Sequence, residues 1–233
     1  MLLLALAVAS SGSSALSPMS LPLDALTRVV GGRGRAKSVW QSIRDGVEPL
    51  SPESCLTPNT RRALQDAGVQ RVVPAVTESA TRAQDGTTKL LVRFPVDDLR
   101  VEAVLIPHPS LPRTTLCVST QVGCDRGCRF CATARMGLVR NLTAAEIASQ
   151  YSCALEYLRF QGRKDGTQTE KDGAKPLSNV VFMGMGDAGV NCENAAEAAG
   201  ILTDQGKFGL AKSKVTASTV GARPPPVEAR AAA

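Results

Sequence analysis

The sequence predicts an α/β protein: a partial (β/α) barrel with about three strands, preceded by a small helical/β accessory domain. Beyond residue 115, short apolar runs with strand character alternate with segments of helical periodicity, which is the order of a parallel sheet. Residues 180–183 are apolar throughout, as parallel strands covered on both faces are. The most reactive side chains, a group of cysteines, directly follow a predicted strand, where such barrels place their chemistry.

Length and composition limit the class of protein. The chain has 233 residues, which suits one sizeable domain or a small domain joined to a larger one. Apolar residues make up 43% of it, enough for a core, whereas aromatic residues make up 3%. The net charge of +6 permits a polyanionic partner without requiring one. Seven cysteines, several of them crowded in one loop, fit a reducing compartment better than a secreted disulfide framework.

Residues 1–27 are predicted to be a signal/transit leader. Residues 2–8 are apolar and residues 10–15 are small, as in a signal peptide, and basic side chains dominate residues 16–37, as in a transit peptide. Some algae address proteins to complex plastids in this way. We therefore expect a plastid or another organelle if the leader is used, and the cytoplasm if the start codon is misassigned. No other stretch is long and apolar enough to cross a bilayer, so no stable membrane association is expected.

Residues 28–75 are predicted to form a helical accessory domain. Residues 37–43 have the spacing of an amphipathic helix with Trp40 on its apolar side, so Trp40 is expected in the core. A second helix is expected from a cap at Asn59 or Thr60 to just before a glycine. Basic side chains outnumber acidic ones here. This excess indicates either an ordinary solvated face or phosphate contacts with RNA, and the pattern alone does not decide between them.

Residues 76–112 are predicted to be a short β connector. Two runs, 89–94 and 101–106, have the composition and alternation of strands. In the second run Glu102 lies on the face opposite to its neighbours on either side. The plain interpretation of Glu102 is a solvated carboxylate on a strand.

Residues 113–221 are predicted to hold the strand–helix units. A strand at 115–120 leads directly into the cysteines. Thr143 and Glu146 have the spacing of a capping box, which begins a helix. The further expected segments are a strand at 180–183, a helix at 193–202, a strand at 214–218 and an atypical Pro/Ala-rich tail at 222–233.

Cys124, Cys128 and Cys131 follow the spacing C-x3-C-x2-C. Thiolates are the preferred ligands of iron–sulfur clusters and of zinc. Three local thiolates on a four-iron cluster leave one iron open to a small molecule. A zinc site with Cys117 or His108 as the fourth ligand is the alternative, although zinc sites more commonly use paired C-x2-C knuckles.

The triad and its flanks resemble the radical S-adenosylmethionine (SAM) methyltransferases of the RlmN/Cfr group. The matching segments are spread over residues 28–221: TLCVSTQVGC at 115–124, Gly137 and NLTAAEI at 141–147, NVVFMGMG at 179–186, and FGLAK at 208–212. Those enzymes methylate an adenine of large-subunit rRNA, at carbon 2 or, in Cfr, at carbon 8, and RlmN-like members also act on certain tRNAs. The resemblance implies that residues 113–221 are the N-terminal half of a radical SAM barrel and that residues 28–75 bind RNA.

The resemblance also implies a cofactor site. The cysteine triad would hold a [4Fe–4S] cluster that binds SAM, and an electron from the cluster would cleave SAM to methionine and a 5′-deoxyadenosyl radical. Gly186 and Asp187 stand where the family has a Gly-Glu-Pro turn that binds SAM, here with a shorter carboxylate and with Ala188 in place of the proline. Ser218 matches a serine near SAM, and Val220 replaces the second serine of that run.

Two further residues gain a role by resemblance. Cys117 matches the thiol that resolves a covalent protein–RNA intermediate by forming a disulfide, although a buried strand cysteine is its plain interpretation. Glu102 matches an acid/base glutamate. The family's other essential cysteine, which carries the methyl group, lies further downstream than this sequence reaches, so a truncated, inactive or incomplete form is expected.

The expected function is radical SAM methylation of an adenine in rRNA, with tRNA as a further substrate. The expected protein is a monomer that receives electrons from a donor such as flavodoxin or ferredoxin. A non-catalytic iron–sulfur or RNA-binding module is the alternative of a different class, and a zinc-binding structural module is a third. The sequence specifies neither the target nucleotide nor the carbon that is methylated.

Overall fold

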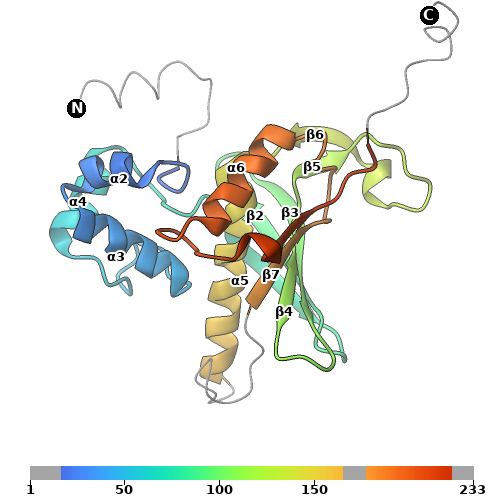
Figure 1. The fold of residues 1–233 in the computed structure, drawn as a ribbon, viewed down its shortest axis with the longest axis horizontal. Coiled ribbons are helices and arrows are strands. Elements are labelled where there is room, and N and C mark those ends of the chain that lie inside the picture. Colours follow the sequence, from blue (N-terminus) through green and yellow to red (C-terminus); the bar gives the residue numbers. More distant parts are fainter. Residues whose placement is uncertain (1–16, 165–176, 222–233) are drawn as a thin grey trace, which may run out of the picture.

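The computed structural model describes residues 17–164 and 177–221 (Figure 1). A unit of three helices lies beside a six-stranded sheet, and two further helices lie between them. The predicted leader up to residue 16 and the predicted tail at 222–233 lie outside the described residues. Within the described part of the chain, no helix combines the length and the apolar character that a membrane span needs.

The helical unit consists of α2 (Leu23–Val30), α3 (Arg33–Arg44) and α4 (Pro58–Asp66). Trp40 of α3 is fully buried, as predicted. Met19 and Leu26, which fall within the predicted leader, are also fully buried in this core. Residues from 17 onward therefore belong to the folded unit, since their apolar side chains complete it.

The N-cap of α4 differs from the predicted one. Thr57 caps the helix, and its hydroxyl accepts a hydrogen bond from the backbone N–H of Thr60 at 3.4 Å. Pro58 follows as the first helical residue, where its missing N–H costs nothing and its fixed φ fits the helix. The helix therefore begins earlier than Asn59 or Thr60.

The large sheet has the strand order β1-β2-β3-β4-β7-β8. β4, β7 and β8 are parallel, which confirms the three predicted strands of the barrel. The predicted β connector at 76–112 contains β1, β2 and β3, which continue the same sheet as antiparallel strands up to β4. The bounds are β1 (Val76–Arg82), β2 (Thr88–Phe94), β3 (Leu99–Pro107), β4 (Thr114–Cys117), β7 (Leu177–Phe182) and β8 (Val215–Ala217).

The cysteine triad lies on an antiparallel hairpin that the sequence did not predict. The predicted strand at 115–120 ends at Cys117, and β5 (Gln121–Cys124) then pairs with β6 (Gly137–Asn141) as a separate two-stranded sheet. The loop between the two strands carries Cys128, Cys131 and a short 3-10 helix, η1 (Thr133–Arg135). The hairpin therefore projects the triad beyond the end of the large sheet (Figure 1).

Two helices cover one face of the large sheet: α5 (Ala144–Lys164) and α6 (Cys192–Thr203). The predicted capping box of α5 is confirmed, because Thr143 and Glu146 exchange hydrogen bonds at 2.8 and 3.3 Å. Buried side chains of β2, β3, β4 and β7 pack on this covered face. The opposite face, which we call the open face, carries partly exposed side chains such as Lys89, Glu102 and Cys117.

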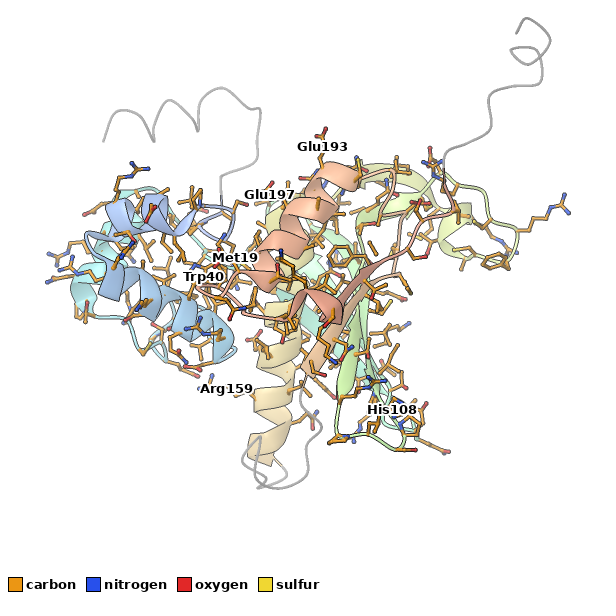
Figure 2. All side chains as sticks on the ribbon, in the orientation of Figure 1. Met19, Trp40, His108, Arg159, Glu193 and Glu197 are labelled. Atoms are coloured by element: carbon orange, nitrogen blue, oxygen red, sulfur yellow. The ribbon has the colours of Figure 1, made fainter. Side chains whose placement is uncertain are left out.

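The helical unit is joined to the rest of the protein through the segment that follows α6. The ring of Phe208 stands edge-on between the rings of Trp40 and Tyr151, with centroid distances of 5.3 and 4.9 Å. Lys207 is buried, places its Nζ 5.4 Å from the centre of the Trp40 ring and donates to the carbonyl of Met19 at 3.2 Å. Figure 2 shows Met19 and Trp40 on the side of the helical unit that faces α6.

Candidate active site

The cysteine loop, residues 124–131, combines one buried and two partly buried thiols. Cys124 ends β5 and is buried, whereas Cys128 and Cys131 are half-buried and joined by a turn in which the Cys131 N–H donates to the Cys128 carbonyl at 3.1 Å. The backbone N–H groups of Ala134 and Thr133 stabilise the thiolate of Cys131 and hold its pKa below the usual value. Cys131 is therefore set up as a ligand, because the thiolate is the form that binds metal.

The three thiols of the triad are chemically suitable ligands for an iron–sulfur cluster. All seven cysteines are free thiols, so none of the triad is used in a disulfide. The three thiols are not drawn together, since no three His, Cys, Asp or Glu side chains within residues 17–164 and 177–221 lie close enough to hold a metal ion. The loop thus supplies the right ligands in an open arrangement that would have to close on a cluster.

His108 does not complete a zinc site with the triad. Its Nδ1 accepts hydrogen bonds from the backbone N–H groups of Ser110 and Leu111 at 3.2 and 3.1 Å. Figure 2 shows His108 at the end of the sheet opposite to Glu193, which lies on the side of the cysteine hairpin. Zinc with His108 as the fourth ligand therefore finds no support among the described residues.

The glycine turn, residues 184–187, follows β7 and packs against the segment between β4 and β5. A Cβ added to Gly184 would lie 2.8 Å from the N of Ser119, and one added to Gly186 would lie 2.6 Å from the Cβ of Gln121. Both distances are shorter than real side chains allow. The side chain of Gln121 also accepts from the Asp187 N–H at 2.9 Å. The glycines are therefore needed for close packing of this turn within the protein.

Asp187 is buried and lies close to the cysteine loop. Its carboxylate accepts hydrogen bonds from the backbone N–H groups of Gly189 at 2.7 Å and of Val220 at 3.0 Å, and Arg126 of the cysteine loop lies 3.8 Å from it. Burial opposes ionisation, but the Thr219 hydroxyl, these two N–H groups and the charge of Arg126 outweigh it and hold the pKa of Asp187 below its usual value. Asp187 is therefore a carboxylate at neutral pH.

Ser218 lies beside this group, but its side chain is exposed. It directly follows β8, which ends at Ala217, and the next two residues are the ones that bond to Asp187. The structure thus brings together the cysteine loop, the turn with Gly186 and Asp187, and the segment that begins at Ser218.

Glu102 and Cys117 lie on the open face, in adjacent strands. Cys117 pairs with Val104, and Glu102 lies two residues before Val104 on the same face of β3. Lys89, from β2, donates to Glu102 at 2.9 Å. Burial raises the pKa of Cys117, partly offset by a hydrogen bond from the Met183 N–H, so its thiol stays protonated at neutral pH. The open face therefore presents a carboxylate, an ammonium and a thiol.

Sequence reasoning missed Arg140, which fixes the cysteine hairpin in place. This β6 residue pairs with Asp97 at 2.7 Å and makes two hydrogen bonds, at 2.9 and 2.7 Å, to Glu146 of the capping box. Its guanidinium also lies over the ring of Phe94, 5.7 Å from its centre. One side chain thus ties the hairpin both to the large sheet and to α5. No local sequence pattern predicts the Arg140–Asp97 pair, because Asp97 is distant in sequence.

Comparison with known proteins finds close relatives along most of the chain. It is 38% identical over 205 residues to the dual-specificity RNA methyltransferase RlmN of Rhodospirillum rubrum, which covers 87% of this chain and 45% of that protein. It is 44% identical over 150 residues to RlmN of Azorhizobium caulinodans, covering 61% of this chain and 36% of that protein. No protein-family model matches the chain. The chain spans less than half the length of these curated relatives.

The fold has a counterpart among solved structures. A radical SAM methyltransferase from Sphaerobacter thermophilus superposes with a TM-score of 0.73 at 32% sequence identity, over 89% of this chain and 58% of that one. The predicted fold class is therefore confirmed. The resemblance seen in the cysteine triad and its flanks is confirmed by both comparisons.

Proposed function

Because the sequence and fold of this chain match those of RlmN-like radical SAM methyltransferases over the part of those proteins that it spans, we propose that it acts in radical SAM methylation of RNA. The proposed substrate is an adenine of large-subunit rRNA, with tRNA as the second RNA class. The observation that carries the proposal is the C-x3-C-x2-C loop, held on its own hairpin next to the glycine turn that follows β7.

In this proposal Cys124, Cys128 and Cys131 hold a [4Fe–4S] cluster, and backbone N–H groups hold the pKa of Cys131 below its usual value. When bound, the cluster supplies the electron for reductive cleavage of SAM. Asp187 and Ser218 border the SAM site, and the buried carboxylate of Asp187 carries the negative charge that suits an ammonium group. A donor such as flavodoxin or ferredoxin would reduce the cluster in a monomeric protein.

The open face would receive the target base. Glu102 would move a proton at its carboxylate, which accepts a hydrogen bond from the adjacent Lys89 at 2.9 Å. Cys117 would act as the thiol on this face, protected from premature ionisation by its burial. The predicted accessory domain, residues 28–75, has an excess of basic side chains and would contact phosphates of the RNA.

Cluster assembly is the first test. Anaerobic reconstitution should give about four iron and four sulfide per chain, the content of one [4Fe–4S] cluster. Replacing any triad cysteine by Ala should abolish iron uptake. Cys153→Ala is the matched control, because Cys153 is a fully buried cysteine of α5 that belongs to the core. Stoichiometric zinc without iron uptake would contradict the proposal.

Methylation is the second test. Reconstituted protein, SAM and a reductant are incubated with rRNA and tRNA fragments, and mass spectrometry measures methylated adenine. Glu102→Gln and Cys117→Ala should keep their iron, and in any form of the protein that methylates RNA they should abolish methylation. Iron uptake and RNA binding without methylation by the unmodified chain would instead favour the non-catalytic iron–sulfur and RNA-binding module.

A further inference from the structure

Arg126 behaves unlike its neighbours in the cysteine loop. Asp125 and Arg129 are exposed, whereas the Arg126 side chain is only 15% exposed and turns inward. Its Nη1 donates to the carbonyl of Gly221 at 3.4 Å, and its Nε lies 3.8 Å from the carboxylate of Asp187. A long charged side chain loses conformational entropy when it is fixed in this way, so its contacts must contribute a favourable interaction energy that offsets this loss.

The partner of Arg126 is a carboxylate that needs a positive charge. Asp187 is only 5% exposed, and a buried ion without a counter-ion is costly. Its three hydrogen-bond donors, Gly189, Thr219 and Val220, are neutral. Among the residues that the structure describes, Arg126 is the cation that forms an ion pair with it.

The ion pair joins three segments that are distant in sequence. Arg126 belongs to the cysteine loop, Asp187 belongs to the glycine turn after β7, and residues 219–221, which both side chains contact, follow β8. The Nε of Arg126 is buried and has no hydrogen-bond partner. Charge attraction at 3.8 Å therefore contributes more to the contact between the two side chains than a directed hydrogen bond does.

We propose that Arg126 is a positioning residue that fastens the cysteine loop to the glycine turn through Asp187. The pair holds the triad and the two segments assigned to the SAM site in a fixed relation before any cofactor binds. This inference rests on the proposed function for its purpose, but it is tested on the metal-free protein. It also commits Asp187 to a role within the chain, whether or not Asp187 touches SAM.

Hydrogen exchange of the metal-free protein tests the positioning directly. In Arg126→Met, which keeps an unbranched aliphatic chain and removes the guanidinium charge, amides of residues 125–135 should exchange about tenfold faster, the size of a modest pairwise coupling. Asp187→Asn should speed the exchange of these amides to the same extent. In the double variant they should exchange no faster than in either single variant. Arg135→Met is the control, because Arg135 is an exposed arginine of the same hairpin, and it should leave the exchange unchanged.

Arg126→Lys distinguishes two explanations of how Arg126 holds the cysteine loop: its positive charge, or the packing of its guanidinium. An ammonium can serve a contact that needs a charge more than a directed hydrogen bond, so Lys should restore most of the protection that Met loses. In reconstituted protein, iron loss to a chelator should follow the same order, fastest in Met and slower in Lys. Unchanged exchange in Arg126→Met, additive effects in the double variant, or failure of Lys to restore protection would each overturn the inference. A wild-type protein that binds no iron, yet shows the paired effect on exchange, would refute the proposed function and leave the positioning standing.

Discussion

We expect Gly123 to be the glycine of the cysteine hairpin at which substitution by alanine destabilises the protein most. It lies in β5 with φ +78°, immediately before Cys124, and a Cβ added there would overlap the carbonyl oxygen of Gly137 across the pair of strands. Gly127 is the matched control, because it lies in the loop that follows with φ +69° and a Cβ added there meets nothing within 4 Å. Alanine is strained by the left-handed backbone at both positions, but only at Gly123 does its Cβ also collide with another atom.

The magnitudes separate the two variants. A left-handed conformation costs an alanine about 1–2 kcal/mol, and overpacking adds about 1–3 kcal/mol. Gly127→Ala should therefore lose about 1 kcal/mol of unfolding free energy, and Gly123→Ala about 3 kcal/mol. Urea unfolding followed by circular dichroism measures both. Gly123→Ala should also impair iron uptake, because it displaces the adjacent Cys124. Equal stability losses in the two variants would refute the reasoning.

Two further predictions concern buried carboxylates. Glu146→Gln should lower the unfolding free energy by about 2–3 kcal/mol, because it removes charged hydrogen bonds to Arg140 and weakens the capping box. Glu193 is an exposed glutamate of α6 and serves as the control (Figure 2). Glu193→Gln should change the unfolding free energy by less than about 0.5 kcal/mol. A similar loss in both variants would contradict the network. Asp187 has a pKa below 3.8, so its contribution to stability is complete above about pH 4 and is lost as pH falls through its native pKa. Asp187→Asn should therefore be less stable than the wild type at pH 7, with a gap that narrows below pH 4; a gap independent of pH would show that ionisation of Asp187 contributes nothing.

The sequence was most informative where a pattern is local. The capping box at Thr143 needs only two residues at the right spacing, and the apolar run of β7 needs only composition, so both were predicted and found. The triad is equally local. The cysteine hairpin was missed because β5 and β6 are short, lie on either side of a loop and contain glycines at 123 and 137 that interrupt any alternation.

Long-range pairing explains the other differences. Residues 76–112 have strand patterns, but nothing in them states that β3 pairs with β4 and so extends the barrel sheet. The pairing of Arg126 with Asp187 is likewise invisible, because an arginine beside a glycine in a loop is ordinarily solvated. The resemblance assigns Asp187 and Ser218 to the proposed SAM site, and the structure shows that both lie next to the segment at 219–220.

The junction at Trp40 gives the molecule a built-in optical reporter. Trp40 is the single tryptophan of the chain, and its ring is fully buried against Phe208 and the ammonium of Lys207, both from the segment after α6. A nearby cation and a change in polarity both alter indole emission, so separation of the helical unit from the sheet would change its wavelength and its access to quenchers. Fluorescence of the unlabelled protein therefore measures whether this joint stays closed when RNA is added, without any probe being introduced.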